Sequence, residues 1–412
     1  MINAKKTALA LSVLLCISSF SACGREKTPL STETIESYEH GSEAGVTGEA
    51  TAALPTEAVP EEVTGGTQPA SIPESGPKDF YVRFAGDINF DESWPTTLYM
   101  DECENGIFDC IDENLVSLMT GADLMYINNE FTYGTDTEIL PDKPYNFRAH
   151  PDRVENLHKI GVDVVSLANN HVFDYQEGGL LATLDTLDAA GIPHFGAGRN
   201  LDEALKPCYI EVKGVRLAFV TSMSDWVDTE TREATDDQSG IVRGGATERF
   251  LDTIREAKEN SDYVIVCAHW GIEYSTDYFS PQVEDAEAYI EAGADAIIGC
   301  HPHIIQRVDY LDDKPVFYSL GNYWFNEKTL YTMLVEAHFH EDESGEMLVD
   351  WKVYPALQSD MKTKMLTGDD ATEYFDYLQA LSGERVVIGS DGSVSEGDTS
   401  ERFDRDYEGE YK

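Results

Sequence analysis

The chain has 412 residues, of which 42% are hydrophobic, so it has enough apolar material for one large domain with an extension. Its 77 acidic residues outnumber 29 basic ones, which gives a formal net charge of −48 at pH 7. This charge argues against nucleic acid as a partner, because such binding depends on Lys and Arg neutralising phosphates. An acidic surface concentrates divalent cations instead.

Residues 1–23 have the three parts of a bacterial export signal: two lysines near the start, an apolar run at 7–20, and small residues before Cys23. The last part resembles a lipobox, although Phe20 stands where Leu is usual. We therefore expect a lipoprotein signal peptide, with a lipidated Cys23 that anchors the protein to the extracytoplasmic face of the cell membrane. Ordinary signal-peptide cleavage is the alternative.

Residues 24–77 are rich in Ser, Thr, Glu, Gly and Pro and contain almost no large apolar side chains. Such a segment cannot bury enough surface to offset the entropy that it would lose on ordering. We expect a disordered stalk that holds the folded domain away from the membrane.

From Asp79 onward, strand patterns alternate with helix patterns, which favours an α/β domain. The predicted strands cover 80–84, 123–128, 163–167, 191–195, 209–212, 215–221, 263–268, 294–298 and 315–319. The predicted helices cover 150–160, 178–190, 247–260 and 281–292. The pair Lys213-Gly214 is expected at the tip of a hairpin.

The pattern changes in the last quarter of the chain. Residues 331–340 and 347–354 alternate apolar and polar side chains, which predicts a hairpin that either completes a sheet or forms a separate lid. A helix is expected over 369–381, and a disordered acidic tail after Gly389. The resulting domain boundaries are 78–360 for the α/β domain and 361–412 for the C-terminal helix and tail.

Polar residues follow six of the predicted strands, which is where α/β folds place their sites. They are Asp87 and Asn89; Glu130; Asn169, Asn170, His171 and Asp174; His269 and Glu273; His301 and His303; and Asn322. Imidazole and carboxylate groups together suit Mn, Fe or Zn. In an H-x-H pair, alternation along an extended backbone can direct both imidazoles to one side. The alternative is that these groups only hydrogen-bond to loop backbone.

Six motifs carry a family resemblance: G-D-I-N-F, N-N-E-F, S-L-A-N-N-H-V-F-D, A-H-W-G-I-E-Y, G-C-H-P-H and S-L-G-N-Y. In this order, between about residues 80 and 325, they resemble the CapA family of poly-γ-glutamate capsule biosynthesis proteins, also called PgsA. That family is similar to calcineurin-like metallophosphoesterases. The resemblance implies a two-sheet sandwich flanked by helices, a four-layer αββα arrangement, with a metal centre at the strand ends.

The resemblance also implies roles for individual residues. The metal ligands would be Asp87, Glu130, Asn170, His269, His301 and His303. His171 would act near the leaving oxygen, with Asp174 beside it. Asn89, Asn169, Glu273 and Asn322 would surround the ligands. Asn89 stands where phosphoesterases place a histidine, and Glu130 sits in N-x-E, so one or two ions remain possible.

The sequence leaves three functions open. The first is an extracytoplasmic role in poly-γ-glutamate capsule biosynthesis or export, with a metal-dependent hydrolase-like site and a membrane synthetase or export complex as partner. The second is a metal-dependent phosphoesterase acting on another cell-envelope substrate. The third is a non-catalytic binding module that uses a degenerate site. The substrate would be an anionic polymer or a phosphoester. A disulfide between Cys103 and Cys110 is also left open.

Overall fold

The structure is a computed structural model that describes residues 78–135, 138–277 and 280–398. The expected signal peptide, its Cys23 and the stalk lie outside these residues. No helix within the described part of the chain is long and apolar enough to cross a membrane.

Two β-sheets form the centre of the domain. Within the described residues the larger sheet has ten strands in the order β19-β20-β17-β16-β1-β2-β5-β6, with β15 beside β1 and β18 beside β17. Strands β1, β2, β5 and β6 run parallel, whereas β16 pairs antiparallel with β1. The strands are β1 (Asp79–Ile88), β2 (Leu124–Asn129), β5 (Val164–Ser166), β6 (His194–Phe195), β15 (Asn322–Trp324), β16 (Leu330–Glu341), β17 (Met347–Ser359), β18 (Lys362–Met365), β19 (Val386–Ile388) and β20 (Ser393–Glu396).

The smaller sheet has six strands over the described ranges, in the order β13-β14-β12-β11-β9-β8. Strands β9, β11, β12 and β14 are parallel, and the predicted hairpin joins β8 to β9. Lys213 and Gly214 at its tip both have positive φ, as a type I′ turn requires. The strands are β8 (Cys208–Val212), β9 (Val215–Met223), β11 (Tyr263–His269), β12 (Ala296–Cys300), β13 (Val308–Leu311) and β14 (Lys314–Phe317). Two short pairs lie apart from both sheets: β3 (Thr132–Tyr133) with β4 (Arg148–Ala149), and β7 (Ala197–Gly198) with β10 (Gly240–Ile241).

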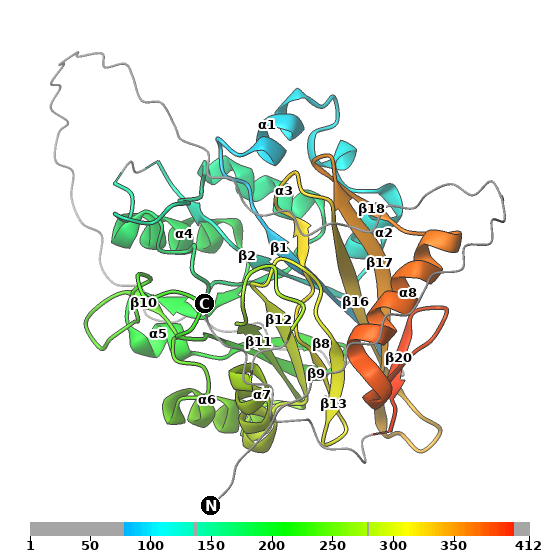
Figure 1. Cartoon of the computed structure of the whole chain (residues 1–412). Coiled ribbons are helices and arrows are strands. Elements are labelled where there is room, and N and C mark those ends of the chain that lie inside the picture. The colour runs from blue at the N-terminus through cyan, green and yellow to red at the C-terminus, as the bar shows by residue number, and fades with distance from the viewer. Residues whose placement is uncertain (1–77, 136–137, 278–279, 399–412) are drawn as a thin grey trace, which may run out of the picture. The chain divides into compact units, whose positions relative to one another are not determined.

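Helices cover the outer faces of both sheets (Figure 1). The helices are α1 (Pro95–Glu102), α2 (Glu113–Thr120), α3 (Val154–Lys159), α4 (Gln176–Ala190), α5 (Leu201–Leu205), α6 (Glu248–Glu259), α7 (Ser280–Ala292) and α8 (Gly368–Ser382). Single 3₁₀ turns occur at Gly106–Asp109, Pro151–Arg153 and Gly383–Arg385. In Figure 1, α1, α3 and α4 lie on the side of the larger sheet, and α6 and α7 lie on the side of the smaller one.

Three buried clusters fill the spaces between these layers. Side chains such as Phe84 and Phe219 meet between the two sheets. Leu184 of α4 and Ile127 of β2 belong to a second cluster, and Phe250 of α6 and Val266 of β11 belong to a third. Burying each such side chain contributes about 1.5–3 kcal/mol, so the layers are held mainly by apolar contact. The predicted α/β sandwich of two sheets flanked by helices is therefore confirmed.

The last part of the chain differs from the sequence-based prediction. The predicted hairpin is the pair β16 and β17, and it completes the larger sheet rather than forming a lid. The tail expected after Gly389 contains β20, which pairs with β17 and β19 and buries Val394. Strands β18–β20 therefore belong to the same sheet as β1, and the expected boundary at residue 360 divides one continuous sheet. Residues 399–412 lie outside the described part.

Two smaller expectations are also refined. The helix predicted at 150–160 begins with a 3₁₀ turn at Pro151–Arg153 and becomes α-helical only at Val154. Cys103 and Cys110 are free thiols in this structure, and burial raises the pKa of Cys110 to about 12, with Cys103 as the next cause.

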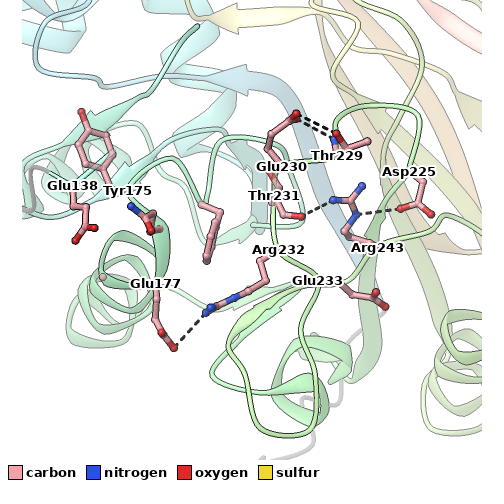
Figure 2. Close-up of a pocket in the computed structure, with 13 residues that line it drawn as sticks. Glu138, Tyr175, Glu177, Asp225, Thr229, Glu230, Thr231, Arg232, Glu233 and Arg243 are labelled. Atoms are coloured by element: carbon pink, nitrogen blue, oxygen red, sulfur yellow. Dashed lines mark hydrogen bonds and ion pairs between the residues drawn. The ribbon is translucent and has the colours of Figure 1, made fainter. Parts of the chain in front are cut away.

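A polar cavity of about 870 Å³ opens among the loops that follow β5 and β9 (Figure 2). Its walls carry two ion pairs: Arg232 Nη2 lies 3.3 Å from Glu177 Oε1, and Arg243 Nε lies 3.1 Å from Asp225 Oδ1. Thr231 forms part of the same wall. The cavity thus presents guanidinium groups that already have carboxylate partners.

Candidate metal centre

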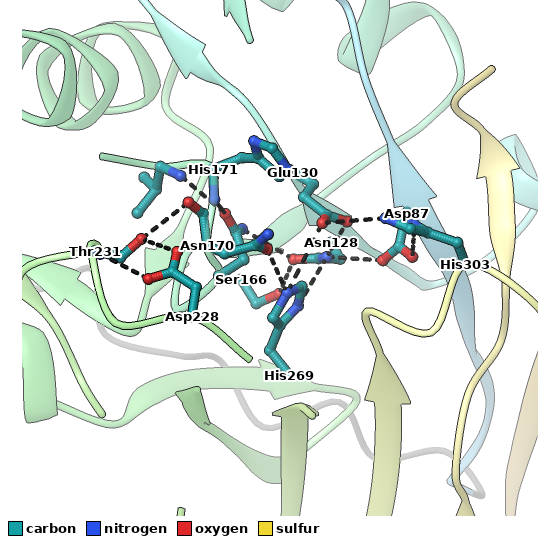
Figure 3. A network of polar contacts seen from close by, with 12 residues as sticks. Asp87, Asn128, Glu130, Ser166, Asn170, His171, Asp228, Thr231, His269 and His303 are labelled. Carbon is teal, nitrogen blue, oxygen red and sulfur yellow. Dashed lines mark hydrogen bonds and ion pairs between the residues drawn. The ribbon is translucent and has the colours of Figure 1, made fainter. Parts of the chain in front are cut away.

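Polar side chains from distant parts of the chain meet where the parallel strands of both sheets end (Figure 3). Asp87 lies in β1, and Glu130 follows β2. His269 ends β11, and His301 and His303 follow β12. Since these strands are parallel within each sheet, their carboxyl ends share one edge, and the side chains after them converge there.

Five of these residues form two triads of potential ligands. Asp87, Glu130 and His303 make one triad, and Glu130, His269 and His301 make the other. Within each triad the ligand atoms lie within 4.8 Å of one another, and all five residues are buried. The Oε1 atom of Glu130 is 3.8 Å from His269 Nε2 and 4.0 Å from His303 Nε2. Glu130 is therefore placed to bridge two neighbouring positions.

Two buried ligand atoms of the cluster make no hydrogen bond with the described residues. Among the described residues, Glu130 Oε1 and His301 Nδ1 are buried and have no hydrogen bond. A buried polar atom without a partner is costly, by about 1–3 kcal/mol. Two carboxylates and three imidazoles are a donor set that suits Mn, Fe or Zn. The residues present therefore fit one or two divalent cations.

The electrostatics of the cluster agree with that fit. Burial, followed by the negative charge of Asp87, raises the pKa of Glu130 well above its usual value. Burial and the neighbouring imidazoles hold the pKa of His269 well below its usual range and lower the pKa of His301 to about 4. Both imidazoles are then neutral at pH 7, which is the form that binds metal. A cation between these groups would also relieve the repulsion between the two carboxylates.

Asp87 and His303 form a tighter pair within the cluster. Their closest atoms, Oδ2 and Nδ1, are 3.2 Å apart. Burial alone would lower the pKa of His303, but the hydrogen bond and charge of Asp87 outweigh it and raise that pKa. Burial would likewise raise the pKa of Asp87, but the bond and charge of His303 help to lower it.

The H-x-H pair is not extended as the sequence analysis expected. His301 and His303 have φ values of 96° and 60°, in the left-handed region. Consequently the two imidazoles do not act as alternate residues of a strand, and each enters a different triad. Non-glycine residues in this region cost about 1–3 kcal/mol each and persist where the surroundings hold them. The Asn322 amide N–H, which donates to His303 O at 3.3 Å, is one such restraint.

Gly86 brings Asp87 into position. A Cβ atom at Gly86 would lie only 1.9 Å from the carbonyl oxygen of Gly321, so only glycine fits there. The Asp87 amide donates to that same oxygen at 3.2 Å. This close approach sets Asp87 opposite Asn322 in the pairing of β1 with β15.

Carboxamides surround the ligands. Asn322 Oδ1 lies 2.8 Å from His303 Nδ1, and Asn169 Oδ1 accepts bonds from the amides of His171 and Val172. Asn170, which was predicted as a ligand, places Oδ1 2.9 Å from His269 Nε2. These three predicted residues therefore contact the cluster or shape its loops.

The other two residues predicted to surround the ligands lie differently. Asn89 Oδ1 accepts a bond from the Asp91 amide at 2.8 Å, which shapes the loop after β1. Glu273 is exposed and acts on His301 and His303 through its charge.

Asn128 received no role from the sequence, yet it lies at the centre of the network (Figure 3). Its Nδ2 donates to Asp87 Oδ1 at 2.8 Å and to Glu130 Oε2 at 3.2 Å. Its Oδ1 accepts from Ser166 and Asn169. Asn128 thus fixes both carboxylates. The feature of the sequence that could have identified Asn128 is its position at the end of β2.

His171 and Asp174 form a buried pair beside the cluster. Asp174 Oδ2 lies 2.7 Å from His171 Nδ1, so Nε2 is the ring nitrogen left for proton transfer. Burial lowers the pKa of His171, although Asp174 opposes this effect. Both residues were predicted to act together, and the structure places them in contact.

Lys143 completes this pair and was not predicted. Its Nζ lies 2.6 Å from Asp174 Oδ1 and 3.8 Å from Asp228 Oδ2, and it donates to the Asn170 carbonyl. Thr231 donates to that same carbonyl at 2.9 Å, which joins the wall of the cavity to the centre. Lys143 and Asp174 are both largely buried, so the charge of Lys143 compensates a carboxylate that water does not solvate.

Comparisons with known proteins agree with the motif resemblance. Residues 81–327 match the family model described as "Bacterial capsule synthesis protein PGA_cap". The chain is similar to the PGA biosynthesis protein CapA of Bacillus subtilis, at 32% identity over 50% of this chain and 55% of the relative. It is similar to the capsule biosynthesis protein CapA of Bacillus anthracis, at 33% identity over 51% of each chain.

A probable polyglutamine synthesis accessory protein of Mycobacterium tuberculosis is 29% identical over 59% of this chain and 64% of its own. The chain thus spans about half to two-thirds of the length of the curated relatives that it matches. Among solved structures, a protein of Thermus thermophilus has 11% identity and a TM-score of 0.34, over 66% of this chain and 98% of that one. A 5'-nucleotidase from Candida albicans has 11% identity and a TM-score of 0.38, over 75% of this chain and 55% of that one.

Proposed function

Since the chain belongs to the bacterial capsule synthesis protein family PGA_cap, we propose that it serves poly-γ-glutamate capsule biosynthesis or export. The match to the family model covers more than half of the chain and includes all the residues of the candidate centre. The names of the two CapA relatives support the capsule polymer as the substrate class. A membrane synthetase or export complex is the corresponding proposed partner.

The proposed activity is metal-dependent hydrolysis. One observation carries it: Glu130 belongs to both triads, and its Oε1 atom makes no hydrogen bond with the described residues. Asp87, Glu130 and His303 would hold one cation, and Glu130, His269 and His301 would hold a second or share the first. When bound, such ions supply an activated water and polarise the bond to be broken.

The chain's own residues provide the remaining steps. Asp174 accepts from His171 Nδ1 and thereby orients Nε2. In the imidazolium form of His171, Nε2–H would protonate the leaving group, which returns the ring to its neutral form. Lys143 pairs with Asp174 and also binds the Asn170 carbonyl. Asn128 keeps both carboxylates in place through its two N–H donors. The burial of the cluster excludes bulk water, which strengthens each of these interactions.

A phosphoester of another envelope component is the second candidate substrate. The observation that makes it a candidate is the His171–Asp174 pair beside two adjacent triads, because a leaving alkoxide can take its proton from such a pair. Both proposals use the same residues of the centre, and they differ only in the substrate that reaches it.

The proposed location is the outer face of the cell membrane, with Cys23 lipidated and residues 24–77 acting as a stalk. Its support is the sequence pattern alone, since these residues lie outside the described part. Metabolic labelling with a radioactive fatty acid tests the anchor. Label should enter the wild-type chain and be absent from Cys23→Ala, which should also leave the membrane fraction. Equal labelling would contradict the anchor.

Elemental analysis of the purified full chain is the first test of the activity. The chain should carry one or two equivalents of Mn, Fe or Zn, and Asp87→Asn or His269→Ala should lose them. The metal-loaded chain is then offered γ-glutamyl peptides and phosphodiesters in parallel. Turnover of the peptides alone supports a capsule hydrolase, and turnover of the diesters alone supports the phosphoesterase. Metal binding without turnover of either class would leave a binding module and refute hydrolysis.

A further inference from the structure

A second group of metal-ligating side chains lies on the larger sheet, away from the centre. His338 and His340 of β16 and Asp350 of β17 present ligand atoms that all lie within 4.8 Å of one another. They surround the beginning of β1 at Asp79, whereas Asp87 lies near the end of that strand. At about 3.3 Å per residue, eight residues of strand separate the two places by roughly 26 Å. This group is therefore independent of the candidate centre.

The strand register explains why these side chains meet. His338 and His340 are two residues apart, so they project from the same face of β16. The residues between and beside them, Ala337 and Phe339, point into the core between the sheets. Asp350 is the direct partner of His338 in the pairing of β16 with β17. One face of the sheet thus carries all three groups.

Each imidazole has a carboxylate at hydrogen-bond distance. His338 Nε2 lies 3.0 Å from Asp79 Oδ1 of β1, and His340 Nε2 lies 2.9 Å from Asp350 Oδ2. Both contacts run diagonally between neighbouring strands, which is within the reach of such side chains. Two imidazoles and two carboxylates from three strands are therefore assembled at one place.

The imidazole rings are also held in position. The His338 ring stacks on Tyr81 with centroids 4.4 Å apart, and its centroid is 4.8 Å from that of His340. Both histidine side chains are 27% exposed, so an ion can reach them while their rotation is restricted. A site whose ligands are already ordered loses little entropy on binding.

We propose that His338, His340 and Asp350 form a second metal site, which takes one divalent cation of the Zn²⁺, Cu²⁺ or Ni²⁺ class. Imidazole nitrogen with a single carboxylate is the donor set that these ions prefer, whereas Mg²⁺ and Ca²⁺ require more oxygen ligands. Asp79 acts as the positioning residue, since metal-bound imidazoles commonly donate their other N–H to a carboxylate. The net charge of −48 favours the approach of any dication.

A cation at this site would cross-link neighbouring strands of the larger sheet. The cation would join β16 to β17 through its three ligands, and Asp79, the first residue of β1, would connect to it through its hydrogen bond with His338. Binding to the folded chain alone raises its melting temperature as ligand is added. Metal binding at this site should therefore be detectable as a rise in the melting temperature.

The test is equilibrium dialysis of the tag-free full chain against buffered micromolar Zn²⁺, followed by elemental analysis. To exclude the central cluster, the experiment uses the Glu130→Gln background. The chain should retain one equivalent of Zn²⁺, and His338→Gln with His340→Gln together should remove it. Asp79→Asn should weaken binding about tenfold, as expected for a residue that orients a ligand.

His150→Gln is the matched control. His150 Nδ1 lies 3.4 Å from Asp152 Oδ2 in another exposed His–Asp pair, but it belongs to no group of three potential ligands among the described residues. This variant should keep the full equivalent. Far-ultraviolet circular dichroism checks that every variant is folded. The proposal is overturned if the double histidine variant is folded and binds as much Zn²⁺ as its parent, or if His150→Gln loses the same amount.

Discussion

Replacing Glu130 with Gln should stabilise the metal-free protein while abolishing its response to Mn²⁺. In the wild type the carboxylate is fully buried, its Oε1 lacks a partner among the described residues, and the charge of Asp87 lies close by. A Gln oxygen can still accept from Asn128 Nδ2, which now lies 3.2 Å from Oε2, and the new NH₂ can donate to Asp87. Removing one unsatisfied buried atom is worth about 1–3 kcal/mol, and we expect a gain of that size.

The assay is urea unfolding of the chelator-treated full chain at pH 8, followed by thermal melting with increasing Mn²⁺, which lies outside the class of ions proposed for the site at His338, His340 and Asp350. A ligand present at about one hundred times its Kd stabilises the wild type by roughly 2.7 kcal/mol, and Glu130→Gln should gain less than about 1 kcal/mol. Glu155→Gln, on the exposed face of α3, is the control and should match the wild type in both measurements. A Glu130→Gln chain that is less stable without metal, or that responds to metal like the wild type, would refute this account of the centre.

Three further predictions concern single residues. His171→Asn should lower kcat on any substrate that the chain hydrolyses by about 10²–10⁴-fold without changing metal content, because it removes the proposed proton donor; loss of metal in this variant would make it a ligand instead. Gly86→Ala should cost about 1–3 kcal/mol in urea unfolding, since its Cβ would meet Gly321 O at 1.9 Å; an unchanged stability would mean that β15 can move away. Burial raises the pKa of Asp285 to about 6, so ionisation disfavours the folded state increasingly between pH 4 and 6. Asp285→Asn should therefore stabilise the chain by about 3 kcal/mol at pH 8 and by little at pH 4, and an equal effect at both would contradict that pKa.

Much of the centre could be predicted because each of its ligands follows a strand directly. Asp87, Glu130 and His269 stand at the ends of apolar runs, and parallel strands bring such ends together without further information. His171 and Asp174 are three residues apart, so their contact is local as well. By contrast, Lys143 lies 31 residues before Asp174 in a loop without periodicity, and its place depends on tertiary packing.

The C-terminal strands show why the expected disordered tail was wrong over Ser393–Glu396. β20 has the sequence S-V-S-E, in which Val394 is the only apolar residue and is buried. A strand this short carries almost no pattern of its own. It forms because Trp351 and Lys352 of β17 offer it an edge, where its partners are Val394 and Ser393. Whether such a short segment forms a strand depends on the sheet edge with which it can pair.

The backbone at His301 and His303 links the fold to the proposed chemistry. In an extended loop the H-x-H pair would send both imidazoles to one side and leave one triad short of a ligand. The left-handed conformations of both residues instead deliver His301 to the triad with His269 and His303 to the triad with Asp87. Each such conformation costs about 1–3 kcal/mol. The His303 ring lies 4.7 Å from that of Phe325, so packing offsets part of this cost. Both conformations carry an imidazole into a triad that contains Glu130, so the shape of this loop matches the proposal that its histidines act as ligands.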